Sequence, residues 1–393
     1  MKTFAIAAAA LIAAGLQAGP AQAQDNYAWP RMLVVGTPGT TTGSFASTNG
    51  WGPVMEKQTG MSVRIVPEGN EMARLQRLTV KKNIQISSTS SAEIRSQVEG
   101  IGAYAAVPAQ PVYILWHHND TPWGYVTSGN SDLTSLKDLA KGGYRISTGV
   151  FSPTLVTSVK KGLPAFAGLT PEEAQDKFIF VPASSYAESC RAVVEGRADI
   201  ALCATISSLL SEMEAAPGGI KWLPMETSDK DGWKGYGNAR PMVVPGPISM
   251  GVKSAIGVEG STSNFLYMVR SDTDEDFAYH MAKWFAESFD DYKSTHPLAA
   301  RMSVERFRHY LNSSPLPVHP GTVRYLKEIG LWDEEDDAWN NAAVARMDAW
   351  VAARNAALKE AMSQGIRPSP DDEAFLAILK KHTADLEGFR VRL

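Results

Sequence analysis

The sequence has 393 residues, of which 38 are Lys or Arg and 42 are Asp or Glu. This length exceeds that of one compact domain and predicts two or three structural units. The small acidic excess favours solubility and argues against nucleic acid or an anionic membrane as a partner. With two cysteines, the chain is not a disulfide scaffold.

The first segment has the features of an export signal. Lys2 gives a positive start, residues 4–14 are almost entirely apolar, and Ala21-Gln22-Ala23 supplies the small-residue pattern that signal peptidase recognises. The apolar run is too short to span a bilayer, which needs about 20 residues. We therefore expect removal of residues 1–23 by cleavage after Ala23, and a periplasmic protein without stable membrane insertion.

From residue 32 onwards, short apolar runs alternate with amphipathic stretches of helical length. The first set predicts, in chain order, a strand at 32–35, a Gly/Thr loop at 36–44, a helix at 45–58, a strand at 62–67, a helix from 69–70, and a strand at 83–87 that ends in the hydroxyl cluster 87–91. A strand at 112–116 and a short helix at 135–139 precede the second set, which predicts a strand at 144–147, a loop at 147–154, a helix towards 161, a strand at 178–181, a helix at 186–195 and a strand at 198–203. The order β–loop–α–β–α–β thus occurs twice, which predicts two lobes, each with a parallel sheet and right-handed crossovers.

The rest of the chain differs in composition. Residues 217–264 are rich in Gly and Pro, so we expect irregular chain together with strands that return to the first lobe. Apolar periodicity and Ala content predict helices at 272–289, 332–362 and 371–386. The acidic run 333–337 fits a helix start, where the helix dipole favours negative charge.

Cysteine and histidine side chains give little sign of chemistry. Cys190 falls in a predicted helix and Cys203 in the strand after it. An oxidising compartment would let them pair, but we favour two separate buried thiols.

His117 and His118 are adjacent and would chelate a metal poorly from a strand, because they would point to opposite faces. We place them in a capped or solvated loop. His319 is expected to fix the turn before a helix.

Known catalytic and nucleotide motifs are missing from the sequence. No nucleophile elbow, His-Glu-x-x-His or Cys-x-x-Cys pattern occurs, so we expect no catalytic residues, no metal site and no cofactor. Gly36, Gly39 and Gly43 lack the spacing of a dinucleotide fingerprint, and no Lys-Ser/Thr pair follows them as in a P-loop. Some aromatic residues could line a cleft but are interpreted as core, namely Trp51, Trp116, Trp123 and Tyr125.

Three hydroxyl-rich loops carry the main functional signal. Loops 36–44, 87–91 and 147–154 each follow a predicted strand, where open α/β sheets bind their ligands. Free backbone N–H groups and helix N-termini at such positions favour anions. Any single loop is explained as a turn or a helix cap. Three of them in equivalent places favour the binding of a small carboxylate, through neutral donors rather than a dedicated arginine.

The order and spacing of several motifs between residues 32 and 330 suggest a family. The motifs are Gly36-Thr-Pro-Gly-Thr-Thr-Thr-Gly-Ser-Phe45, then Gly69, Arg77-Leu78 and Ile84-Gln-Ile-Ser87-Ser88, then Leu136-Lys-Asp-Leu139 and Gly196-Arg-Ala-Asp199, and finally His319-Pro-Gly-Thr-Val-Arg-Tyr325-Leu-Lys-Glu328-Ile-Gly330. In these motifs the chain resembles the TAXI-type solute-binding proteins of TRAP transporters.

The resemblance implies an α/β fold with two lobes, of the periplasmic-binding-protein class (type II-like), and a helical C-terminal extension. Residues 24–116 and about 240–330 would form lobe I, residues 117–239 lobe II and residues 331–393 the extension. The protein would capture a small-molecule ligand, an organic anion or amino acid, by hinge closure. It would then deliver this ligand to the membrane permease subunits of a TRAP transporter driven by an ion gradient.

The resemblance also points to the residues that would bind the ligand. These are Thr37, Gly39, Thr40, Thr42, Ser44 and Phe45 from the first loop, Ser87, Ser88 and Thr89 from the third strand, and Gly149, Phe151, Ser152, Thr154 and Thr205 from lobe II. The chain departs from the family where Pro38, Thr41 and Thr42 replace glycines and where the bulky Phe151 stands in the second-lobe loop. These changes imply a reshaped pocket, so a glutamate-like ligand is not assumed.

Three alternatives remain open. A receptor for an ABC transporter, or a sensory protein that presents its ligand to a membrane receptor kinase, would use the same residues. A secreted hydrolase would place Glu68, Asp199 or His117 at the cleft, but it also needs a nucleophile–base pair that we do not find in the sequence.

Overall fold

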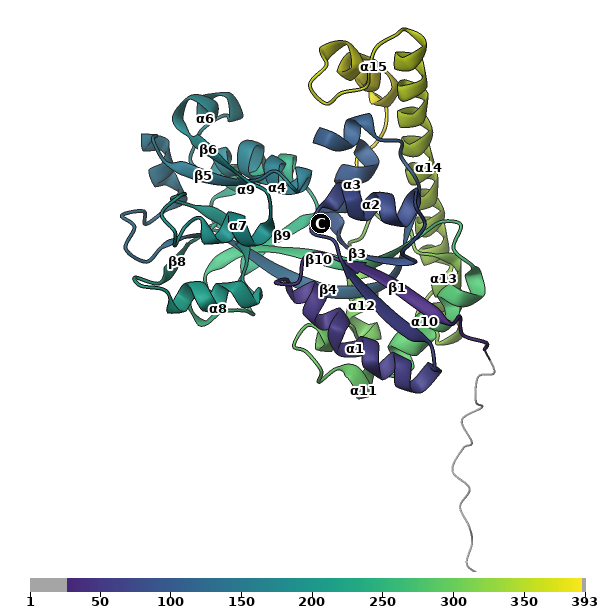
Figure 1. Cartoon of the computed structure of the whole chain (residues 1–393). Coiled ribbons are helices and arrows are strands. Elements are labelled where there is room, and N and C mark those ends of the chain that lie inside the picture. Colours follow the sequence, from purple (N-terminus) through teal and green to yellow (C-terminus); the bar gives the residue numbers. More distant parts are fainter. Residues whose placement is uncertain (1–26, 391–393) are drawn as a thin grey trace, which may run out of the picture.

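The structure, a computed structural model, describes residues 27–390 and shows two α/β lobes with a helical arm along one of them (Figure 1). The predicted signal segment, with its cleavage after Ala23, lies outside these residues. The strands are β1 (Met32–Thr37), β2 (Ser62–Pro67), β3 (Ile86–Ser90), β4 (Val112–Ser128), β5 (Arg145–Gly149), β6 (Ile179–Ala183), β7 (Ala201–Ala204), β8 (Ile220–Leu223), β9 (Val243–Pro247) and β10 (Glu259–Arg270). The helices before β9 are α1 (Gly43–Thr59), α2 (Glu71–Thr79), α3 (Ser91–Glu99), α4 (Pro153–Thr157), α5 (Leu163–Phe166), α6 (Pro171–Lys177), α7 (Tyr186–Arg191), α8 (Ser208–Ala215) and α9 (Lys230–Ala239). The helices after β10 are α10 (Glu275–Glu287), α11 (Phe289–Tyr292), α12 (Val304–Leu311), α13 (Pro320–Glu328), α14 (Glu334–Ser363) and α15 (Glu373–Thr383). Short 3-10 or π turns are η1 (Gly102–Ala106), η2 (Leu136–Lys141), η3 (Ser158–Gly162), η4 (Lys253–Ala255) and η5 (Ala299–Arg301). None of the described helices has both the length and the apolarity needed to cross a membrane.

Two long strands connect the lobes. One sheet runs in the order β2-β1-β3-β10-β4-β7, with β8 also on β4 and β9 also on β10. Strand β4 has 17 residues and β10 has 12. The first part of β4 pairs with the last part of β10 in lobe I, and the end of β4 pairs with β7 and β8 in lobe II. Because β4 and β10 continue from one lobe to the other, they are placed to act as a hinge.

The predicted strand at 112–116 and the predicted loop at His117 and His118 need correction. Both histidines lie inside β4, where they are 1% and 0% exposed. The polar residues after them suggested a loop, but pairing with β10 keeps the chain extended. His117 Nδ1 bonds the main-chain oxygen of Arg301 at 2.9 Å, whereas His118 Nδ1 bonds the hydroxyl of Ser88 at 2.8 Å. The two rings therefore serve different parts of lobe I.

The hydroxyl cluster after the third predicted strand also needs correction. Strands β1, β2 and β3 are parallel as predicted, but β3 begins three residues later than expected and contains Ser87, Ser88 and Thr89 itself. This segment forms a strand because β1 lies on one side of it and β10 on the other. Its buried hydroxyls find partners within the protein, such as the 2.8 Å contact between Ser87 and Thr89.

Lobe II is built from shorter strands and contains a disulfide. Strands β5 and β6 form a parallel pair, which an isolated bridge between Ile146 and Ile200 links to the segment before β7. Cys190 of α7 and Cys203 of β7 are joined, with their Cα atoms 6.1 Å apart. Our expectation of two separate thiols was therefore wrong. Helix α7 packs directly on β7, which brings the two cysteines to bonding distance.

Helix α9 was not predicted, because the Gly and Pro content of residues 217–264 suggested irregular chain. Asp229 caps its first turn. Gly235 faces α5 so closely that a Cβ would lie 2.4 Å from the Cβ of Ala165. The glycines that lower helix propensity here are thus the residues that let α9 approach α5.

The hydrophobic cores divide the lobes at other residues than the sequence suggested. One large cluster surrounds the sheet of lobe I, and two smaller clusters in lobe II include Val243, Ile248 and Val252, which lie beyond the predicted boundary at residue 239. His117 and His118 lie beyond the predicted boundary at residue 116 but contact lobe I.

Helices α14 and α15 pack together through a fourth cluster. Asp333 caps α14, which confirms the predicted role of the acidic run. Buried Arg354 of α14 fixes this helical arm to lobe I by donating to the main-chain oxygens of Gln97 and Tyr104.

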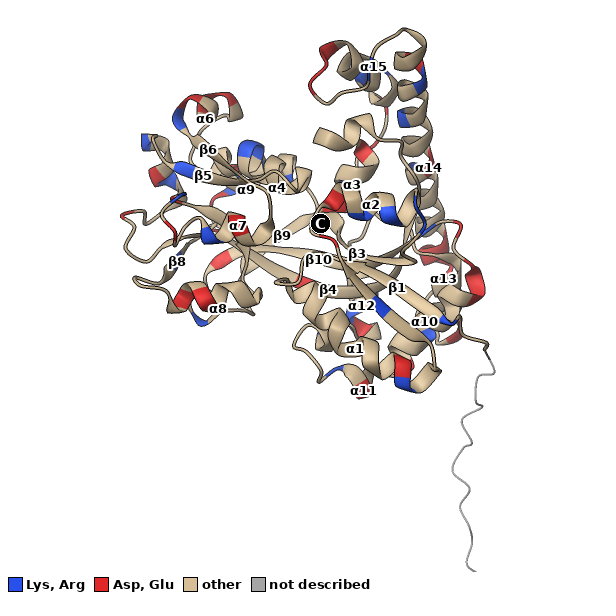
Figure 2. Cartoon of the chain, in the orientation of Figure 1, with Lys and Arg blue, Asp and Glu red and all other residues tan. Residues whose placement is uncertain are grey.

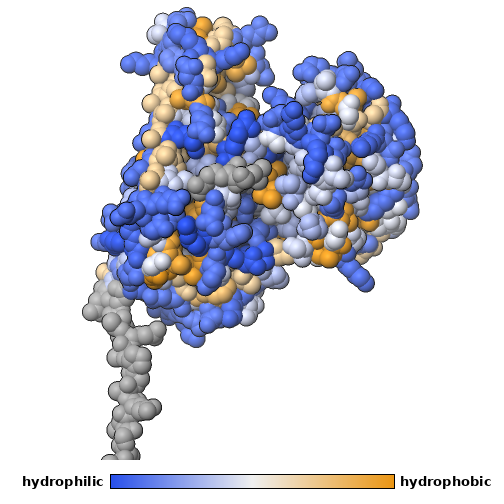
Figure 3. Space-filling view, turned by 180° about the vertical axis from the view of Figure 1, so that it is seen from behind, coloured by the Kyte–Doolittle hydropathy of each residue, from blue (hydrophilic) through white to orange (hydrophobic). Residues whose placement is uncertain are grey.

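The visible surface is mixed in charge and mostly hydrophilic. In Figure 2, basic and acidic residues are interspersed over both lobes, and neither sign gathers on one side. The face seen in Figure 3 carries small hydrophobic patches within a largely hydrophilic surface. This distribution matches the small net charge of −4 for the whole sequence.

Candidate functional site

A cavity of about 270 Å³ lies between the two lobes. Its hydroxyl-bearing wall residues are Thr40, Thr41, Thr42, Ser44, Ser90, Thr121, Thr154, Ser185 and Ser207, its aromatic ones Trp123, Phe151, Tyr186 and Phe265, its charged ones Glu71, Arg74, Glu93 and Arg240, and the others Pro38, Gly39, Gly43, Gly69, Leu155, Ala187, Ala204 and Ile206. The volume is slightly below the range of about 300–1,000 Å³ that is typical of small-molecule sites. The size therefore suits a small solute.

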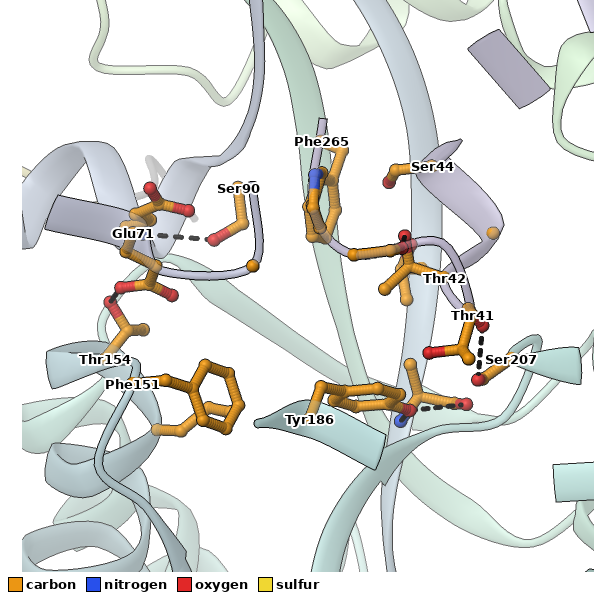
Figure 4. Close-up of a pocket in the computed structure, with 18 of the residues that line it drawn as sticks. Thr41, Thr42, Ser44, Glu71, Ser90, Phe151, Thr154, Tyr186, Ser207 and Phe265 are labelled. Atoms are coloured by element: carbon orange, nitrogen blue, oxygen red, sulfur yellow. Dashed lines mark hydrogen bonds between the residues drawn. The ribbon is translucent and has the colours of Figure 1, made fainter. Parts of the chain in front are cut away.

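Hydrogen bonds between the lobes bridge the cavity on two opposite sides (Figure 4). On one side, the hydroxyl of Ser207 donates to the main-chain oxygen of Thr41 at 2.7 Å. On the other side, Ser152 and Thr154 of lobe II donate to the two carboxylate oxygens of Glu71 in lobe I. The structure is therefore a closed arrangement of the lobes.

The loop at 36–44 forms the lobe I wall because it leads β1 directly into α1. The hydroxyl of Thr42 accepts from the backbone N–H of Phe45 at 3.3 Å and donates to the main-chain oxygen of Gly39 at 2.7 Å. Gly43 and Ser44, in the first turn of α1, line the cavity. The positive end of the α1 dipole thus lies at the cavity wall, where it favours an anion.

The corresponding loop of lobe II brings an aromatic ring to the cavity. After β5, Ser152 caps α4 by accepting from the N–H of Leu155 at 3.1 Å. Phe151, just before this cap, lines the cavity. A Cβ on Gly149 would lie 2.7 Å from the ring of Phe151. Gly149 therefore makes room for Phe151 and does not itself line the cavity.

Four aromatic side chains give the cavity an apolar surface. Trp123 and Phe265 come from the hinge strands β4 and β10, whereas Phe151 and Tyr186 come from lobe II. In Figure 4, Phe151 and Tyr186 lie on one side of the space and Phe265 lies opposite. The hydroxyl of Tyr186 accepts from the N–H of Ala204 at 2.9 Å. Burial raises the pKa of Tyr186, so this side chain stays neutral.

The acidic side chains of the wall have partners within the protein. Arg74 pairs with Glu93 at 2.6 Å and also donates to the main-chain oxygen of Glu68. Burial raises the pKa of Glu93, and the charge of Arg74 acts against this rise. Burial likewise raises the pKa of Glu71, and the hydrogen bond from Ser152 acts against it.

Arg240 differs from Arg74 in its surroundings. It follows α9, is 3% exposed, and stacks with its guanidinium carbon 5.4 Å from the ring centroid of Trp123. Its nearest hydrogen-bond partner is the hydroxyl of Tyr236, at a long 3.4 Å. Within residues 27–390, its Nε and the indole N–H of Trp123 are both buried without a partner. The cavity wall thus contains two arginines, which the prediction of neutral donors did not include.

The structure brings part of the predicted site together. The predicted residues that line the cavity are Gly39, Thr40, Thr42, Ser44, Phe151 and Thr154. The predicted residues that do not line it are Thr37, Phe45, Ser87, Ser88, Thr89, Gly149, Ser152 and Thr205. Several of these hydroxyls are used inside the protein: Thr37 donates to the main-chain oxygen of Pro38, and Thr205 to that of Met250.

Other wall residues were not identified from the sequence. Tyr186 begins helix α7, which follows strand β6. The predicted binding loops also lie between a strand and the helix after it, so the same reasoning could have identified Tyr186. Trp123 was interpreted as core, and Phe265 and Arg240 carry no local signal, because the pairing of β4 with β10 and the end of α9 place them at the cavity.

Metal and acid–base chemistry find little support among the described residues. No group of three or more His, Cys, Asp or Glu side chains in residues 27–390 is arranged to hold a metal ion. The described cavity wall contains neither His nor Cys. Two hydroxyls donate to Glu71: Ser152 is fully buried and does not line the cavity, whereas Thr154 lines it at 3.3 Å from the carboxylate.

Comparisons with known proteins give a family and a set of structural neighbours. A family model described as NMT1-like matches residues 35–330. A search of curated proteins gave no match. An R. palustris protein solved with adipate is 15% identical, with a TM-score of 0.45 over 83% of this chain and 98% of that chain. An ancestral arginine-binding protein bound to glutamine is 13% identical, with a TM-score of 0.41 over 70% and 98%.

A further neighbour is a histidine kinase sensor domain with similarity to periplasmic binding proteins, 13% identical, with a TM-score of 0.41 over 69% of this chain and 96% of that chain. The topology of the chain itself confirms the predicted two α/β lobes and the helical C-terminal part.

Proposed function

This chain belongs to the NMT1-like family, and we propose that it is a periplasmic receptor that captures a small carboxylate-bearing solute between its lobes. The observation that carries the proposal is the cavity that both lobes and the connecting strands enclose. A concave, largely apolar site with a few convergent polar groups is the usual form of a small-molecule site. The α1 N-terminus and Arg240 in its wall favour an anion.

Hinge closure is the mechanism that the geometry supports. The bonds of Ser207 to Thr41 and of Thr154 to Glu71 join groups that lobe opening would separate. A solute that contacts both lobes adds further bridges and shifts the population towards the closed form. Strands β4 and β10 take up the motion, because they are the chain connections between the lobes.

Two observations support the periplasm as the compartment. The first is the export signal predicted before Ala23. The second is the bond between Cys190 and Cys203, because structural disulfides persist in oxidising compartments.

The membrane partner follows from the resemblance to TAXI-type proteins. The late motif from His319 to Gly330 supports it, and in the structure His319 caps α13. We propose delivery to TRAP permease subunits, which an ion gradient drives. Solute uptake into vesicles that contain the permease should require this protein and collapse with the ion gradient. Uptake that instead follows ATP hydrolysis would show an ABC-type partner.

A panel of small acids tests the receptor function on the protein without residues 1–23. The panel contains amino acids, dicarboxylates, keto acids and sulfonates. A solute at 100 times its Kd should add about 2.7 kcal/mol to the free energy of unfolding and raise the melting temperature. Small-angle X-ray scattering should show a smaller radius of gyration, because the solute holds the lobes closed.

Two Phe→Ala variants of lobe II control this experiment. Phe151→Ala removes an apolar wall contact and should weaken binding about tenfold. Phe180→Ala truncates another half-buried ring of the same lobe, on β6 and away from the cavity, and should leave the affinity unchanged. Equal effects of the two variants, or a panel without any binding, would contradict the receptor function.

A further inference from the structure

The charged side chains in the cavity wall indicate which class of solute binds there. This inference rests on the receptor function proposed above. Arg74 already has a counter-charge in Glu93 at 2.6 Å. For Arg240, the structure shows no comparable partner within residues 27–390, and its Nε is buried without a hydrogen bond. The charge of Arg240 acts against the rise that burial causes in the pKa of Glu71, but within residues 27–390 no ion pair or hydrogen bond joins the two side chains, and both oxygens of Glu71 accept from lobe II.

A buried guanidinium without a counter-charge is costly, so the structure predicts that a ligand supplies one. The ring of Trp123, 5.4 Å from the guanidinium, provides a cation–π contact but accepts none of the in-plane N–H groups. The terminal Nη groups of Arg240 have only the long 3.4 Å bond from Nη1 to Tyr236 within residues 27–390, so they can donate to the two oxygens of a carboxylate in the cavity.

The acidic residues of the wall leave no site for a second charge on the ligand. Glu93 is bound by Arg74. Both oxygens of Glu71 accept from lobe II, one from Ser152 and the other from Thr154. An ammonium group on the ligand would have to displace these bonds. A second carboxylate would meet Glu71 and Glu93, while Arg74 is already paired.

The rest of the wall suits an apolar body. Phe151, Tyr186 and Phe265 surround the cavity, and the hydroxyl of Tyr186 is already bound to Ala204. We propose that the solute is a small monocarboxylate with an apolar body and no ammonium group. Its carboxylate binds the guanidinium of Arg240.

Calorimetric titration of the wild-type protein with four related compounds tests this class. Phenylacetate is the expected ligand, phenylacetamide removes its charge, phenylalanine adds an ammonium group, and adipate adds a second carboxylate. Phenylacetate should bind at least about 30-fold more tightly than phenylacetamide, because loss of one partner from a buried charge pair has about this effect. Phenylalanine and adipate should also bind more weakly. Equal affinity for the acid and the amide would overturn the proposal.

The variant Arg240→Gln assigns the charge preference to one residue. It should bind phenylacetate no more tightly than phenylacetamide, while its affinity for the amide stays the same. Its stability without ligand should not fall, because the substitution removes an unpaired buried charge. Arg145→Gln, which alters a surface pair with Asp199, is the control and should keep the preference for the acid.

The outcomes separate this inference from the receptor function. If Arg240→Gln keeps the acid preference, Arg240 is not the anchor. If another class of solute binds and phenylacetate does not, the inference fails and the receptor function stands. If no solute binds, the receptor function itself fails. Should Arg240→Gln not fold, the wild-type comparison of acid with amide still decides.

Discussion

The two lobes follow the same order of strands and helices, yet different interactions stabilise them. Lobe I surrounds a continuous sheet with one large core. It also contains a buried hydrogen-bonded network in which His118 contacts Ser88 and Tyr267. Lobe II has two smaller cores, and its β5–β6 pair is linked to the rest by the isolated bridge at Ile146. A disulfide cross-links this lobe, beside the buried hydrogen bond between Ser147 and Ser189.

The position of the disulfide links the stability of lobe II to its binding wall. Cys190 lies one turn after Tyr186 on α7, and Cys203 directly precedes Ala204 on β7. Tyr186 and Ala204 are hydrogen-bonded to one another and both line the cavity. We infer that lobe II, with its smaller cores, is the less stable lobe and that the disulfide keeps its wall in place.

Loss of the disulfide should have the largest effect. The variant Cys190→Ala with Cys203→Ala should lose about 3 kcal/mol of stability, as expected for a closed loop of about 15 residues. We expect a separate, lower melting transition for lobe II, faster hydrogen exchange in α7 and β7, and weaker solute binding. Calorimetry with and without reductant measures the melting transition of lobe II. Reductant should affect the wild type and leave the double variant unchanged; an unaltered wild type would refute the weaker-lobe interpretation.

Low pH should destabilise lobe I, because Asp120 becomes protonated. Burial alone would raise the pKa of Asp120, but the hydrogen bond and charge of His117 and the charge of Arg301 lower it from 3.8 to about 2. Because the folded pKa lies below the unfolded one, the interaction stabilises the protein above about pH 4 and is lost as the pH falls towards 2. Its contribution is about 2 kcal/mol.

Urea unfolding of the wild type and of Asp120→Asn at pH 6, 4 and 2.5 measures this contribution. The two proteins should differ most at pH 6 and converge at pH 2.5. Asp290→Asn, in an exposed pair with Lys293, should differ little from the wild type at any of these pH values. A constant difference between wild type and Asp120→Asn would contradict the assignment.

Removal of the cap of α1 should have the smallest effect. Thr42→Ala removes the acceptor for the N–H of Phe45 and should lower stability by about 1 kcal/mol. Thr42→Ser keeps a capping hydroxyl and should restore most of it in thermal melts. Ser152 caps α4 in lobe II but also donates to Glu71 across the lobes, so Ser152→Ala should in addition favour opening of the lobes. Small-angle X-ray scattering without solute should show a larger radius of gyration for Ser152→Ala than for Thr42→Ala, and equal values would remove this distinction between the lobes.

Local signals predicted much of the fold. The strand at 62–67 matches β2 residue for residue, because an alternating apolar pattern between a glycine and a proline leaves little choice. The acidic start of α14 is equally local, since Asp333 caps a helix that begins one residue later. Part of the site follows from the same chemistry: the loop at 36–44 turns a strand into a helix, and this turn places Thr42 at the cavity wall.

The alternation of apolar runs and caps within the sequence was thus enough to determine two α/β lobes and the loops at their strand ends. The tertiary structure decided the rest, because it depends on contacts between distant segments. Pairing with β10 turned Ser88 and its neighbours into a buried strand, and packing of α7 on β7 joined Cys190 to Cys203. The same kind of long-range packing brought Arg240 onto Trp123, and no local pattern could have shown that a buried cation there lacks a partner.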